Sequence, residues 1–324
     1  MNKEVITDKQ QMKNEAIKVF VKRGRSIESI HEVNAVLSDQ KGKIIMSAGD
    51  PNFTTFIRSS LKPFQAIPFI NRGASQQLRN EEKGIAIACG SHCGSIVHAR
   101  EAFKILWESE VDVSDLQCPI GKDEKSKLTH NCSGKHASFL ATCRRMNWST
   151  KNYLDQDHPL QLDIIRNISN ILNCPCDELI LEKDNCGAPT LNLQLGQMAH
   201  LYAHLSMSQN QHSRKIISAM IAYPDLVAGK GFFDTELITK GEGQLISKGG
   251  SEGIQCIGKI NEGFALAIKV LDGSKRAKHA VAIHLLKQLD WLASKAIKEL
   301  FVETLIFSPG VELEVSGNLS FYQS

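Results

Sequence analysis

Long apolar runs and a strong charge of one sign are both missing from this sequence. No stretch of 18 apolar residues occurs, so no membrane-spanning helix is predicted. The 38 lysines and arginines nearly balance the 35 aspartates and glutamates, and the densest basic run, residues 21–25, is short. Nucleic-acid-binding proteins usually carry a basic excess or a basic stripe, so that class of function is not favoured.

The sequence also lacks a secretion signal and an even set of cysteines. Residues 1–16 are charged and contain no apolar segment of the signal-peptide type. We therefore expect a cytoplasmic protein, in which disulfides are rare. The nine cysteines then serve as core residues, reactive thiols or metal ligands. Cys118, Cys143 and Cys256 stand in apolar or mixed surroundings and are predicted to be small core residues.

The composition is that of a globular protein, with 42% hydrophobic and 23% charged residues. The 324 residues are long for one lobe and short for two large independent domains. No internal repeat or low-complexity linker divides the sequence. Residues 1–324 are therefore expected to form a single domain with two lobes.

Strand patterns stand at both ends of the chain, and helical patterns lie between them. The simplest arrangement is an α+β fold, in which one antiparallel sheet flanked by helices carries an inserted helical lobe. The sheet lobe is expected over roughly 16–75 and 223–324, and the helical lobe over roughly 76–222. The predicted strands are 16–24, 27–37, 43–47, 244–249, 253–258 and 263–270, and the predicted helices are 95–108, 134–147, 159–173, 193–207, 211–222 and 276–301.

Ser59 and Lys62 form the first candidate catalytic pair. A further helix is predicted to begin near these residues, because Pro63 is tolerated only in a first turn. Their spacing then places both side chains on one helix face. A serine hydroxyl needs a base, and lysine is a base only when its usual pKa of ~10.4 is lowered by burial or a nearby cation. Taken alone, the pair is a very weak signal of catalysis, and an ordinary helix start with a solvated lysine is the favoured interpretation.

Two later motifs add context to that pair. Ser91 lies in the sequence ACGSHCG, and Lys248 lies in a KGG sequence at the end of a predicted strand. A serine–lysine pair, a second serine and a lysine–glycine–glycine strand are similar to the three-motif layout of serine β-lactamases and penicillin-binding proteins. The second motif is not S-D-N, and the third lacks its hydroxyl residue, so any relationship is distant.

Two cysteine loops suggest a metal site. Cys132 lies in THNCSGKH and Cys186 in KDNCGAPT, and two thiolates with a nitrogen donor can hold zinc with a fourth position open. Lys135 is an unusual but possible nitrogen donor, whereas His130 and His136 are the more conventional ones. Buried thiols without a metal are the plain alternative. Other pairs are less well supported as metal sites, and these are Cys174 with Cys176 and Cys89 with Cys93.

Together these residues identify a family resemblance. The sequence resembles the rhizobial-type, or class 3, asparaginases, also called the asparaginase II family. The matching stretches run through most of the chain in one order: RGRSIESIHE, GDPNFTTFIRSSLKPFQAIP, ACGSHCG, HNCSGKHASFL, YLDQDHPLQ, DNCGAPT, YPDLVAGKGFFDT, KGGSEGIQCIG and KVLDGSKRA.

The resemblance implies a fold like that of the serine β-lactamases, a homodimer, a zinc ion, and hydrolysis of L-asparagine to L-aspartate and ammonia. It assigns the nucleophile to Ser59, its partner to Lys62 and the second active-site serine to Ser91. The second lysine is Lys248, with Lys269 as a competing candidate. The zinc ligands implied by the resemblance are Cys132, Lys135 and Cys186.

Two more residues are expected to hold the substrate. Arg58 is a candidate partner for the substrate carboxylate, with an ordinary surface charge as the alternative. Asp184 is expected either to meet the substrate ammonium or to support the cysteine loop. The chain departs from the family pattern beside Ser91, because Cys93 stands where the family usually has serine and Ser95 where it usually has glutamate.

The mechanism that follows begins with attack of the Ser59 hydroxyl on the side-chain amide carbon. Neutral lysine takes the proton, Ser91 passes a proton to the leaving ammonia, and water hydrolyses the β-aspartyl ester. Backbone N–H groups near the helix start and near Lys248 are expected to stabilise the oxyanion. The alternatives are a β-lactam or peptide-bond hydrolase, in which the cysteine loops have no role, and a non-catalytic zinc-binding or regulatory protein that retains the fold.

Overall fold

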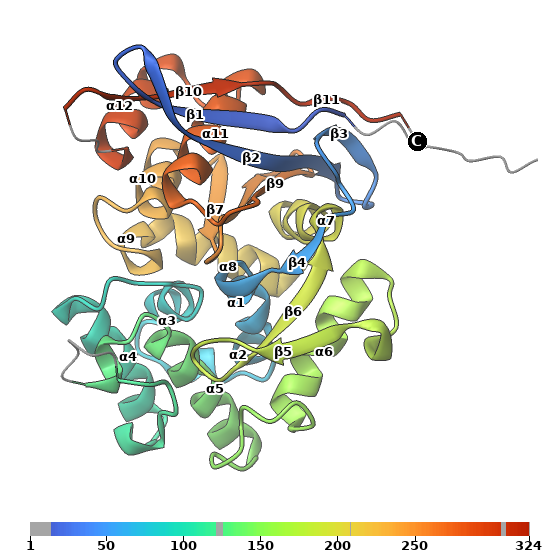
Figure 1. Cartoon of the computed structure of the whole chain (residues 1–324). Helices are drawn as coiled ribbons and strands as arrows, with labels where there is room; N and C mark the ends of the chain where they lie inside the picture. Colours follow the sequence, from blue (N-terminus) through green and yellow to red (C-terminus); the bar gives the residue numbers. More distant parts are fainter. Residues whose placement is uncertain (1–13, 121–125, 208, 306–308, 324) are drawn as a thin grey trace, which may run out of the picture.

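The computed structural model describes residues 14–120, 126–207, 209–305 and 309–323. The charged stretch that motivated the cytoplasmic prediction lies largely outside these residues. The described chain is α+β, with an antiparallel sheet in one half and a mostly helical half beside it (Figure 1). This confirms the predicted sheet with a helical insertion, while the predicted lobe boundaries stay a prediction. None of the described helices is long and apolar enough to span a membrane.

The main sheet combines strands from both ends of the chain. Its order is β10-β1-β2-β9-β8-β7, with β3 pairing β2 and β11 pairing β3, and all pairings are antiparallel. The strands from the N-terminal and C-terminal parts of the chain meet where β2 pairs with β9, with Val33 opposite Val270 and Asp39 opposite Phe264. The strands are β1 (Ile17–Arg23), β2 (Ser26–Asp39), β3 (Ile44–Ala48), β7 (Leu245–Gly249), β8 (Ile254–Lys259), β9 (Phe264–Val270), β10 (Val311–Ser316) and β11 (Ser320–Phe321).

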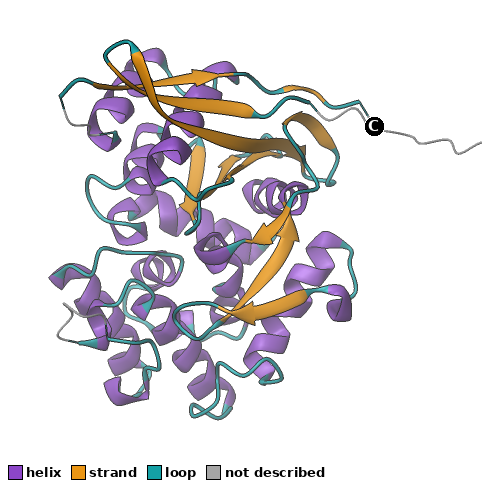
Figure 2. Cartoon of the chain, in the orientation of Figure 1, coloured by secondary structure: helices purple, strands orange, loops and turns teal. Residues whose placement is uncertain are grey.

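The two faces of the main sheet bury against different helices, because successive strand side chains point to opposite sides. Along β9, Leu266 and Ile268 belong to the core formed with α10, α11 and α12. Ala265 and Ala267 belong to the other core, in which α7 packs on the sheet. Each fully buried leucine or isoleucine contributes roughly 1.5–3 kcal/mol. The sheet therefore lies between two hydrophobic cores. Figure 2 shows its strands in orange with helices beside them.

Helices and a small second sheet build the remaining half of the molecule. The predicted helices there are confirmed to within two residues at each end. The second sheet has the order β4-β6-β5. The helices are α1 (Lys62–Gln65), α2 (Ile67–Asn71), α3 (Glu81–Ala88), α4 (Ile96–Glu108), α5 (Ser133–Met146), α6 (Pro159–Leu172), α7 (Leu195–Ser206), α8 (Gln211–Ala222), α9 (Pro224–Val227) and α10 (Phe233–Lys240). The small strands are β4 (Thr54–Phe56), β5 (Ile180–Lys183) and β6 (Pro189–Gln194), and the 3-10 turns are η1 (Arg58–Leu61), η2 (Ser75–Gln77), η3 (Val113–Asp115), η4 (Lys127–Thr129) and η5 (Cys176–Glu178).

The prediction of one helix over 276–301 is wrong. The structure has two helices, α11 (Lys275–Gln288) and α12 (Ser294–Thr304). Asp290 adopts a left-handed conformation (φ 53°) and Trp291 N–H donates to Leu286 O at 3.0 Å. Asp290 N–H also donates to Lys287 O at 3.3 Å, which completes a Schellman motif. The residues between the two helices instead bury Trp291 in the core as the chain turns.

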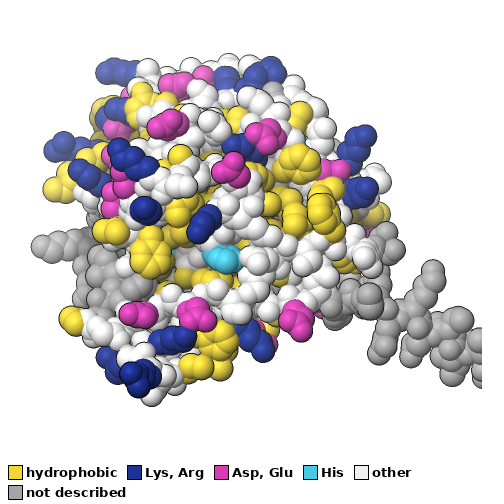
Figure 3. All heavy atoms as spheres, turned by 90° about the horizontal axis from the view of Figure 1, so that it is seen from above, with side chains coloured by type: hydrophobic (Ala, Val, Ile, Leu, Met, Phe, Trp, Pro, Cys, Tyr) yellow, Lys and Arg dark blue, Asp and Glu magenta, His cyan; other side chains and the backbone are white. Residues whose placement is uncertain are grey.

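Charge is distributed without a basic stripe on the face seen in Figure 3. Lysine and arginine side chains alternate there with acidic and apolar ones. This pattern agrees with the nearly balanced composition. Cys118, Cys143 and Cys256 are buried, which confirms the prediction that they are core residues.

Candidate active site

Ser59 and Lys62 lie where the chain passes from the small sheet into its first helices. The helical start predicted near them is confirmed, since turn η1 runs directly into α1, with Pro63 in the first turn of α1. Arg58, immediately before Ser59, has a left-handed backbone (φ 53°), a conformation that is costly for a residue with a side chain. Such strain is typical of functional sites, where surrounding contacts hold it in place.

Ser60 anchors this turn to the main sheet. Its buried hydroxyl donates to the carbonyl of Lys248 at 2.8 Å, and its own carbonyl accepts from Tyr202 at 2.7 Å. Tyr202 lies on α7, which packs against the sheet. The turn carrying Ser59 is therefore fixed to the strand that carries Lys248.

The amine of Lys62 is buried among three oxygen atoms. It lies 2.6 Å from Gly90 O, 3.1 Å from Asn131 O and 2.8 Å from Ser91 Oγ. Burial lowers the pKa of Lys62, and the charge of Lys135 lowers it further, while the thiol of Cys132 opposes this change. The lowering of the pKa that a basic lysine requires is thus present, with burial as its main cause and Lys135 as the nearby cation.

Of the three contacts of the Lys62 amine, only the one with Ser91 can have either partner as the donor. Carbonyl oxygens can only accept, so Gly90 and Asn131 each take one N–H of Lys62. A charged Lys62 donates its third proton to Ser91, whereas a neutral Lys62 accepts the Ser91 proton on its lone pair. The same geometry therefore suits both protonation states and permits proton transfer between Lys62 and Ser91.

Ser91 is held by backbone pairing rather than by a helix. It lies in the loop between α3 and α4, where Ser91 N–H donates to Val227 O at 2.7 Å and Cys93 N–H donates to Ala228 O at 2.9 Å. The neighbouring Ser95 caps α4 through His98. The two departures from the family pattern thus occupy a loop end and a helix cap beside Ser91.

Lys248 lies at the end of β7 and is fully buried. Its ammonium donates to Gly249 O at 2.8 Å and lies 3.7 Å from Asp234 Oδ2. Burial lowers the pKa of Lys248 to about 8, with Lys62 and Lys278 adding to the effect and Asp234 opposing it. The group is therefore a cation that loses its proton unusually easily.

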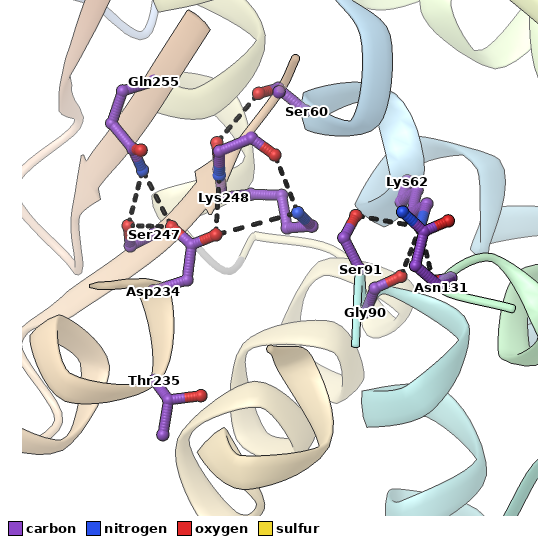
Figure 4. Close-up of polar contacts among 12 residues, drawn as sticks. Ser60, Lys62, Gly90, Ser91, Asn131, Asp234, Thr235, Ser247, Lys248 and Gln255 are labelled. Atoms are coloured by element: carbon purple, nitrogen blue, oxygen red, sulfur yellow. Dashed lines mark hydrogen bonds and ion pairs between the residues drawn. The ribbon is translucent and has the colours of Figure 1, made fainter. Parts of the chain in front are cut away.

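Asp234 organises the polar contacts on this side (Figure 4). Its Oδ1 accepts from Ser247 at 2.7 Å and from Gln255 at 2.8 Å, and its Oδ2 accepts from Gly249 N–H at 2.8 Å. Although burial opposes its charge, the ammonium groups of Lys248 and Lys278 and these hydrogen bonds lower its pKa to about 2. Asp234 is therefore an anion throughout the neutral range.

A cavity of about 290 Å³ brings these groups together. Ser59, Ser91 and Lys248 all line it, although they are far apart in sequence. Lys269, the competing candidate for the second lysine, is not one of the lining residues, and its ammonium donates to Glu252 O. The full lining is Ser59, Ser91, Asn131, Ala228, Phe232, Phe233, Asp234, Lys248, Gly249, Gly250, Ser251, Glu252, Gly253, Gly273, Lys275, Lys278 and His279.

The three residues that the resemblance implied as zinc ligands also lie together. Lys135 Nζ donates to Cys186 Sγ at 3.2 Å, and both cysteine side chains are buried. A hydrogen bond from Cys132 and the charge of Lys135 lower the pKa of Cys186, whereas the same hydrogen bond and burial raise the pKa of Cys132. The arrangement thus favours a thiolate at Cys186, beside the ammonium of Lys135, and a protonated thiol at Cys132.

The donor set fits a zinc ion only if the amine of Lys135 takes part. Among the described residues, no group of three or more His, Cys, Asp and Glu side chains is gathered closely enough to hold a metal ion. His130 Nδ1 accepts from Cys132 N–H at 3.1 Å, and His136 Nδ1 shares a 2.8 Å hydrogen bond with Tyr153. The set is therefore the two thiols of Cys132 and Cys186 with the amine of Lys135, and an amine is an uncommon nitrogen ligand for zinc, which usually takes histidine.

Arg58 and Asp184 are paired with each other. The guanidinium of Arg58 lies against Asp184 Oδ1 through two nitrogens, each at 2.8 Å. Neither residue is one of those lining the cavity. Their predicted contacts with substrate therefore stay predictions.

The sequence alone assigns no role to Asp234, Lys278 or Asn131. Asp234 stands inside the motif YPDLVAGKGFFDT, whose pattern indicates no function for it. Lys278 belongs to α11 and looks like one of many helix lysines in the sequence. Asn131 acts through its backbone carbonyl, which no sequence pattern reveals.

Comparison with known proteins places these observations in context. A protein-family model described as L-asparaginase II matches residues 19–320. No curated protein matches the chain significantly.

Solved structures with similarity to the chain include three kinds of protein. The structure of Mglu shows 11% identity and a TM-score of 0.47, covering 80% of this chain and 67% of that one. A Bacillus glutaminase shows 10% identity and a TM-score of 0.39, covering 80% and 91%. A β-lactamase from Mycobacterium bovis shows 8% identity and a TM-score of 0.36, covering 85% and 95%. Across the Mglu structures, this chain spans between 59% and 67% of their length.

Proposed function

The chain belongs to the L-asparaginase II family, and from this premise we propose that it hydrolyses the side-chain amide of L-asparagine to L-aspartate and ammonia. One observation carries the proposal. The buried amine of Lys62 contacts Ser91, and Ser91 shares one cavity with Ser59 and Lys248. This arrangement supplies a nucleophile, a base and a proton route in one place.

The first half-reaction forms an acyl-enzyme. The Ser59 oxygen bonds to the amide carbon while the Ser59 proton passes to neutral Lys62. The C–N bond then breaks, and the leaving nitrogen takes a proton from Lys62 through the Ser91 hydroxyl. Ammonia departs and a β-aspartyl ester remains on Ser59. The short contact between Lys62 and Ser91 supports this route.

The second half-reaction reverses the same path. Water gives one proton to Lys62 through Ser91 and adds its hydroxide to the ester carbon. The C–O bond to Ser59 breaks, and Ser59 recovers a proton from Lys62, so that L-aspartate is released with the enzyme unchanged. The ammonium of Lys248, which lines the same cavity, favours the negative charge on the carbonyl oxygen in both tetrahedral intermediates.

We also propose that Cys132, Lys135 and Cys186 hold a zinc ion. Zinc bound there supplies a positive charge that stabilises the two thiolates and fixes their loops. Cys132 directly follows Asn131, whose carbonyl lies 3.1 Å from the Lys62 amine. Ordering the cysteine loop therefore also orders the Asn131 carbonyl that holds the Lys62 amine.

Two finer features complete the proposal. Arg58 is a candidate partner for the substrate carboxylate, and Asp184 either meets the substrate ammonium or supports the cysteine loop. A contact of either side chain with substrate requires the Arg58–Asp184 ion pair to open. The protein is proposed to act as a homodimer, and sedimentation equilibrium measures its mass directly against the 35.8 kDa of one chain.

Ammonia release from purified protein tests the proposed function. L-asparagine and L-glutamine are compared side by side, and turnover of L-asparagine is expected to exceed that of L-glutamine. Ser59→Ala is expected to abolish turnover, and mass spectrometry of the quenched native enzyme should show the aspartyl ester on Ser59. Ser60→Ala is the control, because the Ser60 hydroxyl is committed to the Lys248 carbonyl, and measurable turnover should persist. Full activity in Ser59→Ala would exclude this serine as nucleophile.

A further inference from the structure

Lys278 reaches the cavity from α11 and has no role in the mechanism above. It is only 7% exposed, yet it is one of the residues that line the cavity. Its ammonium donates to Gly250 O over a long 3.3 Å hydrogen bond. An ammonium has three donors, so Lys278 has further capacity to bind an acceptor placed in the cavity.

The charges around Lys278 are not balanced by the protein. The ammonium of Lys248 lies 3.7 Å from Asp234 Oδ2, and the charge of Lys278 acts on the same carboxylate, whose two oxygens already accept from Ser247, Gln255 and Gly249. One buried carboxylate therefore serves two buried ammonium groups. Buried charges are normally paired, because an unpaired one is costly to remove from water. A ligand anion at this point restores the balance.

The cavity rim carries one more charge of each sign. Lys275 is exposed, with its ammonium 5.6 Å from the centre of the Phe232 ring. Glu252 is an exposed acidic residue in the turn between β7 and β8, and both residues line the cavity. These two rim charges offset one another. The excess of positive charge therefore comes from the buried lysines rather than from the rim.

We propose that Lys278 binds the α-carboxylate of the substrate and so restricts the enzyme to amides of free α-amino acids. The inference rests on the proposed function, which it deepens by naming the residue that selects the substrate class. Arg58 is less suited to this task, because its guanidinium is already bonded to Asp184. Lys278 offers its charge without breaking an ion pair.

The test compares two amides that differ by the carboxylate alone. L-asparagine carries it, and 3-aminopropanamide is the same molecule without it. Lys278→Gln and Lys278→Met are measured beside the wild type, with Lys259→Gln as control. Lys259 is similarly buried (6% exposed) but does not line the cavity, and its ammonium bonds Gln244 at 2.8 Å.

Both Lys278 variants are expected to raise the Michaelis constant for L-asparagine by roughly 10- to 100-fold, as expected for loss of a charge-assisted hydrogen bond, with kcat changing much less. The amide without a carboxylate should keep its Michaelis constant, or its inhibition constant if it is not turned over, within about twofold. Calorimetry should show the same selective loss for L-aspartate against β-alanine. The control should change neither constant.

Equal effects on both amides, or no effect on L-asparagine, would overturn the role of Lys278. A wild type that releases no ammonia from any amide would instead refute the proposed function. The two failures are distinct, because the calorimetric comparison of L-aspartate with β-alanine does not need turnover. If Lys278→Gln does not fold, the apolar Lys278→Met variant, which buries no polar group, gives the same comparison.

Discussion

The substitution Asp234→Asn tests how the buried charges beside the cavity are held. Asparagine has nearly the shape of aspartate but replaces one oxygen by an N–H donor group. Both oxygens of Asp234 accept hydrogen bonds, on one side from Ser247 and Gln255 and on the other from Gly249 N–H. Either orientation of the amide therefore sets donor against donor, and Lys248 loses its anion.

The expected loss of stability is about 3–5 kcal/mol at pH 7, the range for removing one partner of a buried ion pair. The lowering of the pKa of Asp234 from 3.8 to about 2 corresponds by itself to about 2 kcal/mol. This stabilisation is complete above pH 3.8 and is lost as the pH falls through about 2.

The stability difference between wild type and Asp234→Asn above pH 7 is the sharper test. The pKa of Lys248 is lowered from 10.5 to about 8 in the native protein, so the cost of burying its charge is complete below pH 8 and disappears as the pH rises to 10.5. Without Asp234 this pKa falls further, since the carboxylate is the group that raises it. The difference between wild type and Asp234→Asn should therefore shrink between pH 7 and pH 10.

Urea unfolding at both pH values measures this difference. Asp163→Asn is a matched control, because Asp163 has the same 8% exposure and its partner is Arg72, at 2.8 Å. Arginine stays charged at pH 10, so the control should lose the same free energy at both pH values. A loss below about 1 kcal/mol for Asp234→Asn, or an equal loss at both pH values, would refute the reasoning.

Three further predictions address the turn, the metal site and the loop beside Ser91. Gly250→Ala should lower kcat by roughly 10- to 100-fold, because the added Cβ would lie 2.9 Å from Ile57 O and displace the turn that carries Ser59. Gly196→Ala is the control and should leave kcat unchanged, because its added Cβ meets only ordinary or mildly tight contacts. Cys132→Ala should lower the zinc content measured by atomic emission, and an unchanged stoichiometry would contradict the ligand set. Ser95→Ala should cost about 1 kcal/mol in thermal unfolding, since it removes the cap of α4, and an unchanged Tm would show that the cap is unimportant.

Local patterns in the sequence predicted much of the fold. Alternating and helical periodicities gave β1, β2 and α4–α8 nearly to the residue, because each buries one face against a core. The patterns failed where contacts between distant segments decide the secondary structure. β5 and β6 lie in a region predicted to be helical, and β10, an edge strand that pairs with β1, was not predicted. The left-handed residue Asp290 divides the final helix, although nothing in its neighbours signals a stop.

The candidate site divides in the same way. The spacing of Ser59 and Lys62 and the helix start were readable, because both depend on neighbours in sequence. Two further motifs pointed to Ser91 and Lys248, and the resemblance gave them roles; the structure places both around one cavity with Ser59. The partners that tune the lysines were not readable. Asp234 and the backbone carbonyls meet them only through contacts between distant segments.

The direct pairing of β2 with β9 has a consequence for synthesis on the ribosome. β2 and β9 are separated by the whole helical half of the chain, so one edge of β2 stays unpaired until the ribosome has made β9. A nascent chain stalled before Leu245 already carries Ser59 and Ser91 but lacks Lys248, the positive charge that the proposed route places near the carbonyl oxygen. The waiting strand edge is also where a chaperone is most needed, because an unpaired edge invites pairing with another chain.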